Sequence, residues 1–392
     1  MDFELTANQK AWRDEIRAFL RENVTEDVLE DVRRNGHATP GAAQAEFSAK
    51  VGAKGWFGLT WPKEFGGLGV GAIYEHIFIN ELEYWGAPRP GIEVTSIAPM
   101  IMRYGTERNR EEFVPPIARG ELKIALGYSE PSAGTDLASL RTRAELDGDE
   151  WVINGHKIWN SGAHRATHQW LAVRTDPSEK RHKGISVVMV PVDTPGIEVR
   201  PLVTWADSRT NETWFNDVRV PATNLIGELN NGWQYITGAL ALERGFITSS
   251  GDLRRAIDDV IALSRRQLPD GTRPADDPNV RRRIAQLDAD VEACELMGLE
   301  ACSAMDRGEL PTLTVTEEKI HSSELRQRVA DVAMQMLGMY GLLTETDPDP
   351  IASGDFERLY RTAPYRRFGG GANEALRDLI AKRAYDMPSY RR

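Results

Sequence analysis

The sequence predicts an α+β protein with an N-terminal helical domain (1–121), an antiparallel β domain (122–228) and a C-terminal helical bundle (229–392). Apolar residues recur with a helical period in the first and last parts. The middle part instead contains β-branched and aromatic runs separated by Gly and Pro turns. A chain of 392 residues is long enough for two or three such structural units.

The N-terminal part begins with the segment TANQKAWRDEIRAFLREN, which has the pattern of an amphipathic helix. Thr6 is a plausible N-cap, and Trp12, Ile16 and Phe19 form an apolar stripe. Further helical segments follow a loop punctuated by Gly and Pro. Residues 3–120 are therefore expected to be helical.

The β domain is predicted from strand-like runs that are interrupted by turn dipeptides. Asp147-Gly148 and Asn154-Gly155 both separate such runs. Asn-Gly between alternating apolar residues is a strong hairpin signal, so we expect a turn at each dipeptide.

The C-terminal part returns to the helical period. Its candidate helices are 232–267, 278–308, 312–341 and 373–384. These helices predict a helical bundle, with the Pro- and Asp-rich stretches between them as loops.

Composition excludes several classes of protein. The net charge of −11 argues against nucleic acid or an anionic membrane as the main partner. No apolar run approaches the length of a membrane span, and the N-terminus lacks the pattern of a signal peptide. Cys294 and Cys302 are the two cysteines; they indicate neither a disulfide framework nor a zinc site, and a reducing cytoplasm is the expected location.

One carboxylate has an unusual place in the pattern. Glu243 falls within the apolar arc of the helix that contains ALALERGF, among Ile236, Ala239, Leu240 and Leu242. One interpretation is a residue at the edge of the arc that reaches water or pairs with Arg244. The other is a general base, because burial raises the pKa of a carboxyl group toward working pH. One helix does not decide between them.

Residues 129–135 suggest a loop that offers hydroxyl groups and close backbone approach to a ligand, and a well-capped connection is the alternative interpretation. YSEPSAGTD joins the helical part to the β domain, KIWNSGA follows an Asn-Gly dipeptide, and RFGGGANEALRDL places glycines before a helix. Together with ALALERGF, and in this order, they closely resemble the acyl-CoA dehydrogenase family. The resemblance covers nearly the whole chain, and the pairing of the first two segments is its most specific part. It implies the family's fold, a helical domain followed by a β domain and a four-helix bundle.

The resemblance implies FAD as the cofactor. It places Leu126, Tyr128 and Ser129 along the flavin, Trp159 beside the isoalloxazine, and Ser161 near its reactive edge, where Thr is more usual. The Gly-rich turn would contact FAD around a helix N-terminus, which favours anions. The residues implied there are Gly371, Asn373 and Glu374. Thr135 would meet the CoA arm of an acyl-CoA substrate.

The resemblance also implies the reaction, the formation of a trans-2-enoyl-CoA, with electron-transfer flavoprotein as the expected electron acceptor. Family members remove the α-proton with a carboxylate while a hydride leaves Cβ for flavin N5. Many carry this base in the Gly-rich turn, at the position of Gly370 in this chain. A second group carries it as Glu-Arg on the first C-terminal helix. This chain matches the second group, so Glu243 is the expected base, and Arg244 would support the substrate pocket or pair at the surface.

The chain departs from the homotetrameric pattern of the family. Pro269 stands where an Arg would hold the FAD diphosphate of a neighbouring subunit, and Gln335 and Gly338 are what remains of the Gln-x-x-Gly-Gly motif. This departure resembles the heteromeric enzymes of bacterial sterol side-chain degradation, which implies a bulky or branched acyl group. We expect an α2β2 heterotetramer with a paralogous subunit. The rival is a homotetramer in which Arg265, Arg266 or Arg273 takes over the role.

Two other functions remain open from the sequence. A non-catalytic partner subunit would have lost its base, whereas this chain keeps Glu243. A relative that resembles acyl-CoA oxidases or nitroalkane-oxidising enzymes would share the fold and differ in oxygen access to the flavin.

Overall fold

The computed structural model describes residues 4–36, 40–179, 181–247, 250–309, 311–347 and 351–388, with the backbone alone for 244–247, 352 and 353. The chain forms two compact units, each built from separate segments. Unit 1 consists of Met1–Val24, Gly71–Ala87 and Arg244–Arg392, and unit 2 of Thr25–Val70 and Pro88–Glu243. The boundaries 1–121, 122–228 and 229–392 remain a prediction.

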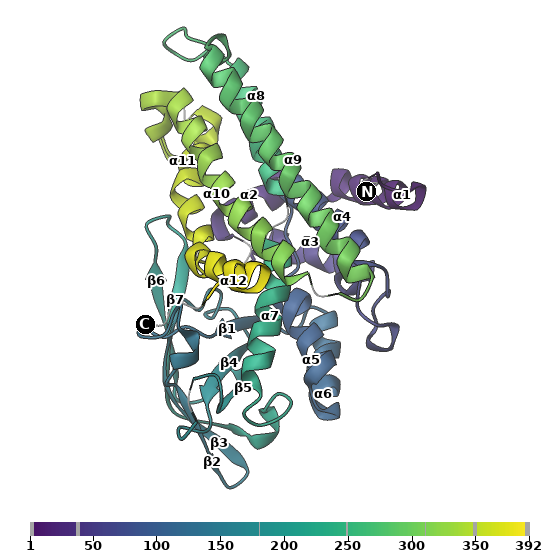
Figure 1. Ribbon diagram of the computed structural model, residues 1–392, viewed down its shortest axis with the longest axis vertical. Helices are drawn as coiled ribbons and strands as arrows, with labels where there is room; N and C mark the ends of the chain where they lie inside the picture. The colour runs from purple at the N-terminus through teal and green to yellow at the C-terminus, as the bar shows by residue number, and fades with distance from the viewer. Residues whose placement is uncertain are drawn as a thin grey trace. The chain divides into compact units, whose positions relative to one another are not determined.

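Unit 1 is helical (Figure 1). Helices α8, α9 and α10 pack on one another, α11 and α12 pack on α10, and α4 packs against α8 and α9. The helices of this unit are α1 (Ala7–Asn23), α4 (Ala72–Tyr84), α8 (Gly251–Arg265), α9 (Pro278–Asp306), α10 (Thr312–Leu337), α11 (Asp355–Thr362) and α12 (Asn373–Tyr385).

The predicted start of the first helix is confirmed in detail. Thr6 accepts a hydrogen bond from the backbone N–H of Gln9, and the Gln9 side chain accepts one from the N–H of Thr6. This capping box satisfies two backbone donors at the helix terminus.

Unit 2 contains the sheet and the helices that cover it. Its helices are α2 (Glu26–Asn35), α3 (Ala42–Ala53), α5 (Ala98–Tyr104), α6 (Glu107–Ala118) and the part of α7 (Gly232–Ile247) that ends at Glu243. Its strands are β1 (Ile124–Gly127), β2 (Arg143–Asp147), β3 (Glu150–Ile158), β4 (His168–Arg174), β5 (Ile185–Pro191), β6 (Ile197–Val203) and β7 (Arg209–Pro221).

The sheet is mainly antiparallel, as predicted, but β1 and β2 each pair with β4 in parallel. The path of strands is β1-β4-β2-β3-β7-β6, with β5 paired to β4. Strands β4 and β5 are buried on both faces. Successive side chains of each strand point to opposite faces, and each face packs in a different hydrophobic cluster. Trp170 and Ala172 pack toward α5, α6 and α7, while Leu171 and Val173 pack among the strands.

The two predicted turn dipeptides have different outcomes. Asp147-Gly148 forms the hairpin turn between β2 and β3, with Gly148 at φ +66°. Asn154-Gly155 lies inside β3 instead, where the register with β7 shifts. Gly155 is needed for close approach to a neighbouring strand, because a Cβ there would lie 2.4 Å from Oγ1 of Thr142.

The predicted helix 232–267 is wrong in its length. α7 ends at Ile247 and α8 begins at Gly251. A Cβ on Gly251 would lie 2.1 Å from the carbonyl oxygen of Asn80, so α8 begins where the chain passes close to α4. The Asn80 side chain also accepts a hydrogen bond from the Gly251 N–H.

Candidate functional site

The loop after β1 is fixed by a buried ion pair. Nζ of Lys157 lies 2.9 Å from Oε1 of Glu130 and donates to the carbonyl of Tyr128 at 3.0 Å. The Glu130 carboxylate also accepts from the backbone N–H groups of Arg141 and Thr142. Lys157 is fully buried, so the loop that carries Tyr128 and Ser129 is tied to β3 through a group with no access to water.

Burial and ion pairing have opposite effects on the pKa values of Glu130 and Lys157. Burial lowers the pKa of Lys157 to about 8, and Glu130 opposes that change. Burial would raise the pKa of Glu130, but the Lys157 charge and the hydrogen bonds hold it below its ordinary value. The carboxylate is therefore ionised at neutral pH.

The turn after β3 presents an aromatic ring on a constrained backbone. Trp159 has φ +66° and its side chain is 55% exposed. A positive φ is rare for a bulky residue and costs free energy, so neighbouring contacts must maintain it. Asn160 supplies them: its side chain donates to the carbonyl of Leu126 at 2.6 Å, and its N–H to the carbonyl of Asn211 at 2.9 Å.

Five of the predicted cofactor residues lie at this edge of the sheet. The Ile158 N–H donates to the carbonyl of Ser129, and Asn160 reaches Leu126, so the β1 loop and the β3 turn are adjacent. Ser161 is exposed, and its hydroxyl donates to Oγ1 of Thr210 at 3.3 Å. The five residues that these contacts bring together are Leu126, Tyr128, Ser129, Trp159 and Ser161. Thr135 is exposed in the same loop region.

Glu243 lies at the end of the α7 segment that belongs to the same unit. It is half-buried. Burial raises the pKa of the Tyr128 hydroxyl well above its ordinary value, and the negative charge of Glu243 raises it further. The charge of the predicted base is therefore felt at the loop after β1. The side chain of Arg244 lies outside the described part of the structure.

The Gly-rich turn and the start of α12 lie in unit 1, around Lys319. Nζ of this fully buried residue donates to the carbonyls of Arg367 (3.1 Å) and Gly371 (2.6 Å) and to Oδ1 of Asn373 (2.8 Å). The Asn373 side chain also donates to Ser323 and Glu324. Asn373 is thus occupied by contacts within the fold, whereas Glu374 is exposed and pairs with Arg367 at 3.3 Å.

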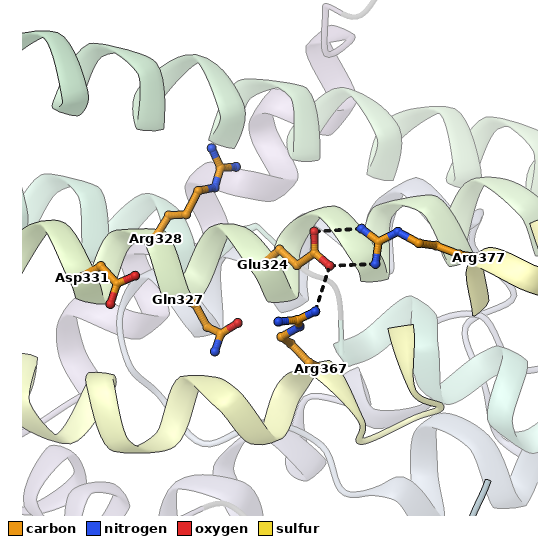
Figure 2. A pocket seen from close by; sticks show the side chains of 6 residues that line it. All are labelled: Glu324, Gln327, Arg328, Asp331, Arg367 and Arg377. Atoms are coloured by element: carbon orange, nitrogen blue, oxygen red, sulfur yellow. Dashed lines mark hydrogen bonds and ion pairs between the residues drawn. The ribbon is translucent and has the colours of Figure 1, made fainter. Parts of the chain in front are cut away.

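An open hollow of about 580 Å³ lies beside this turn (Figure 2). Glu324 stands between Arg367 (3.6 Å) and Arg377 (2.8 Å). Arg328, which also lines the hollow, pairs with Asp290 at 2.5 Å. Because these charges neutralise one another, we assign the hollow no ligand. Its lining residues are Glu324, Gln327, Arg328, Asp331, Arg367 and Arg377.

The segment after α8, which departs from the homotetrameric pattern, forms a tight turn. The N–H of Leu268 donates to the carbonyl of Thr272, and Pro269 is exposed. Arg273 pairs with Asp276 at 2.8 Å. Arg265 and Arg266 are exposed, and in the described ranges neither makes an ion pair.

Sequence reasoning did not single out Lys157, Asn160 or Lys319. A signal existed for two of them. Lys157 shares the inward-facing set of β3 with Trp151 and Ile153, and Lys319 lies four residues after the buried Val315 on α10. A lysine on a buried face needs hydrogen-bond acceptors. Backbone carbonyls of a nearby loop can supply them, and the loop is then held in place.

Comparison with known proteins gives a consistent result over the whole chain. Three family models match: acyl-CoA dehydrogenase N-terminal domain at residues 6–121, middle domain at 125–218 and C-terminal domain at 230–385. Acyl-CoA dehydrogenase FadE26 of Mycobacterium tuberculosis is 36% identical, and the alignment covers 99% of each chain.

Solved structures agree with these matches. A chain of the ChsE4–ChsE5 complex from Mycobacterium tuberculosis superposes with a TM-score of 0.90 at 36% identity, covering 100% of both chains. A chain of the Tcur3481–Tcur3483 steroid ACAD superposes with a TM-score of 0.89, also at 36% identity and full coverage. Within the described residues, no helix is long and apolar enough to cross a membrane.

Proposed function

Because the chain belongs to the acyl-CoA dehydrogenase family of oxidoreductases, we propose that it converts an acyl-CoA thioester to the trans-2-enoyl-CoA with Glu243 as the base. The observation that carries this proposal is the half-buried Glu243, which continues a helix face packed on the core of unit 2 and interacts with Tyr128. A carboxylate partly removed from water is a stronger base than an exposed one.

The described residues fit a flavin. Trp159 offers an exposed aromatic ring on a fixed backbone, and Ser129 and Ser161 offer hydroxyl groups beside it. When bound, FAD supplies the acceptor for the hydride that leaves Cβ. Leu126, Tyr128 and Ser129 would contact the flavin through the β1 loop that Lys157 holds in place. The proposed contacts in the C-terminal part lie at the start of α12 and are Gly371, Asn373 and Glu374.

The protein's own contribution to the reaction is to bind the thioester, orient it and take up a proton. Glu243 would accept the α-proton on a carboxylate oxygen. The apolar residues of the same helix, Leu240 and Leu242, would keep water from the carboxylate. Thr135, which is exposed in the loop after β1, would contact the CoA arm. Arg244 is proposed as a support of the substrate pocket.

We assign the substrate to the bulky acyl-CoA thioesters, of which a steroid side-chain acyl-CoA is the leading example. The support is full-length similarity at 36% identity to a chain described as a steroid ACAD. We also assign electron-transfer flavoprotein as the electron acceptor, in keeping with the family.

An α2β2 assembly with a paralogous subunit is proposed on two grounds. The ChsE4–ChsE5 structure, which this chain resembles over its full length, is a complex of two named components. In this chain Pro269 occupies the exposed turn where a diphosphate-binding Arg was expected, and Arg273 is engaged by Asp276. A diphosphate buried at a subunit interface needs a cationic partner.

The proposed function is tested by anaerobic reduction of the yellow holoenzyme, purified with its paralogous subunit. A steroid side-chain acyl-CoA should bleach the flavin faster than a straight-chain acyl-CoA of similar length. Glu243→Gln should retain FAD and lower the rate of bleaching by ~10²–10⁴-fold, because the amide cannot accept the α-proton. Glu198→Gln, which changes an exposed carboxylate on β6, is the matched control and should bleach normally.

The outcomes separate the competing functions. Bleaching of Glu243→Gln at the wild-type rate would rule out Glu243 as the base. Reoxidation by air faster than by electron-transfer flavoprotein would identify an oxidase. A holoenzyme that no acyl-CoA bleaches would contradict the proposed reaction itself.

A further inference from the structure

Tyr128 and Trp170 lie on the same face of the sheet. Leu126 pairs with Trp170 across the parallel β1–β4 ladder, and Tyr128 follows Leu126 by two residues. Because side chains alternate between faces, Tyr128 extends the row that contains Leu126 and Trp170. Both aromatic residues are buried in the core cluster of unit 2.

The face of α7 that packs on this cluster leads to Glu243. Ile236, Ala239 and Leu240 all contact the cluster. They precede Glu243 by seven, four and three residues, which are the spacings of one helix face. The carboxylate therefore projects from the same side of α7 that meets the β1–β4 row.

The two aromatic side chains each carry a buried polar atom that lacks a partner. The Tyr128 hydroxyl and Nε1 of Trp170 make no hydrogen bond within the described part of the chain. An unpartnered buried polar group lowers the stability of the fold. Phe at position 128 would fill nearly the same space without this cost, so the Tyr128 hydroxyl points to a role in the loaded enzyme.

We propose that in the FAD-loaded enzyme the Tyr128 hydroxyl positions the proposed base by donating a hydrogen bond to a carboxylate oxygen of Glu243, while its own oxygen accepts one from the Trp170 N–H. This inference rests on the proposed function of Glu243. The Tyr128 hydroxyl is buried in the core cluster of unit 2, and the Glu243 charge and the Trp170 indole both act on its pKa. No bond to carbon changes; the hydroxyl keeps its proton and fixes which carboxylate oxygen faces the substrate.

The direct test is infrared spectroscopy of the holoenzyme labelled with ring-¹³C tyrosine, without substrate. The difference between wild type and Tyr128→Phe identifies the C–O band of Tyr128. That band should shift in Glu243→Gln, because an amide oxygen is a weaker acceptor than a carboxylate. An unshifted band would overturn the proposal. The measurement needs no turnover, so it gives a result even if the proposed reaction is wrong.

A second measurement asks whether the contact acts on the base. A hydrogen bond to the carboxylate stabilises its ionised form, so in Tyr128→Phe the midpoint of the pH dependence of flavin reduction should rise by about one pH unit. Tyr235→Phe is the control. Tyr235 is buried in the same cluster, but its hydroxyl accepts from the N–H of Glu228 and has a structural role.

The pair of variants separates positioning from simple stabilisation. Tyr235→Phe should lower the melting temperature without moving the pH midpoint. If Tyr128→Phe lowers the melting temperature and leaves the midpoint where it is in the wild type, Tyr128 serves only the fold.

Discussion

At the scale of single residues, the buried lysines explain how exposed loops hold their shape. Lys157 and Lys319 are both fully buried, and each donates to backbone carbonyls of a loop with a predicted ligand contact. The sequence predicted those loops from their Gly, Ser and Pro content. It did not predict the lysines that fix them, because the acceptors are backbone atoms brought close only by the tertiary fold.

Lys319→Met should destabilise unit 1 and loosen the Gly-rich turn. The substitution keeps the volume of the side chain but leaves two carbonyls and the Asn373 amide without their donor, at a cost of about 2–4 kcal/mol. The free energy of unfolding in urea measures this loss. The flavin content of the purified holoenzyme should fall as well.

The control for this prediction is Lys382→Met on α12. Lys382 lies at the surface and pairs with Asp378 one helical turn away. Exposed pairs of this kind contribute about 0.3–0.5 kcal/mol, so the control should change stability little. Equal stability of the two variants would show that the Lys319 contacts are not needed.

The cofactor contact of Asn373 stays a prediction, and the contacts of its side chain leave the backbone of this residue for it. Its place at the start of α12 suggested a cofactor contact, yet its side chain is completely buried and bonded to Lys319, Ser323 and Glu324. Position along a helix is readable from sequence, whereas the direction of a side chain depends on which neighbours pack against it. Glu374, one residue later, is exposed.

At the scale of elements, helix caps and alternating strands were predictable because they depend on local sequence. The Thr6 capping box and the Asp147-Gly148 turn are examples. The strand that runs through Asn154-Gly155 was not, because Gly155 pairs with Phe215 of β7 and packs closely on Thr142, and both neighbours are brought there by the tertiary fold. The parallel pairing of β1 with β4 escaped prediction for the same reason: the two strands are far apart in the chain.

Gly155→Ala tests the close approach of Gly155 to Thr142. The added Cβ would lie 2.4 Å from Oγ1 of Thr142 and 2.7 Å from its Cα, and backbone cannot move aside cheaply. We expect a loss of about 1–3 kcal/mol in the free energy of unfolding. Gly134→Ala is the control because an added Cβ there meets no atom within 4 Å. A loss of the same size in both variants would contradict the steric explanation.

At the scale of the whole molecule, the family and its order of parts were predictable because two motifs lie at the family's separation and two more follow in its order. The family models cover the chain from residue 6 to residue 385 with short gaps. The division into two compact units was not foreseen. Unit 1 contains α1 and α4 from the N-terminal part of the chain. The packing of α4 on the C-terminal helices is long-range, and no local sequence pattern predicts it.

Purification of this chain alone should give protein that is insoluble or poor in FAD, since the turn at Pro269 lacks the expected Arg. Co-expression with a paralogous chain should restore a complex with one FAD for each pair of chains. Flavin absorbance and protein concentration measure this ratio, and light scattering gives the mass. A stable homotetramer with one FAD per chain would contradict the heteromer, and Arg265→Ala and Arg266→Ala would then test the replacement contacts.

The left-handed backbone of Trp159 has a consequence for how this protein would respond to selection. Glycine adopts positive φ freely, whereas Trp159 holds φ +66° at a cost of about 1–3 kcal/mol and exposes an indole ring to water. Selection for heat resistance alone would therefore favour Trp159→Gly, which relieves the backbone and removes the ring that we propose as a flavin contact. A tryptophan in this conformation serves a purpose other than stability.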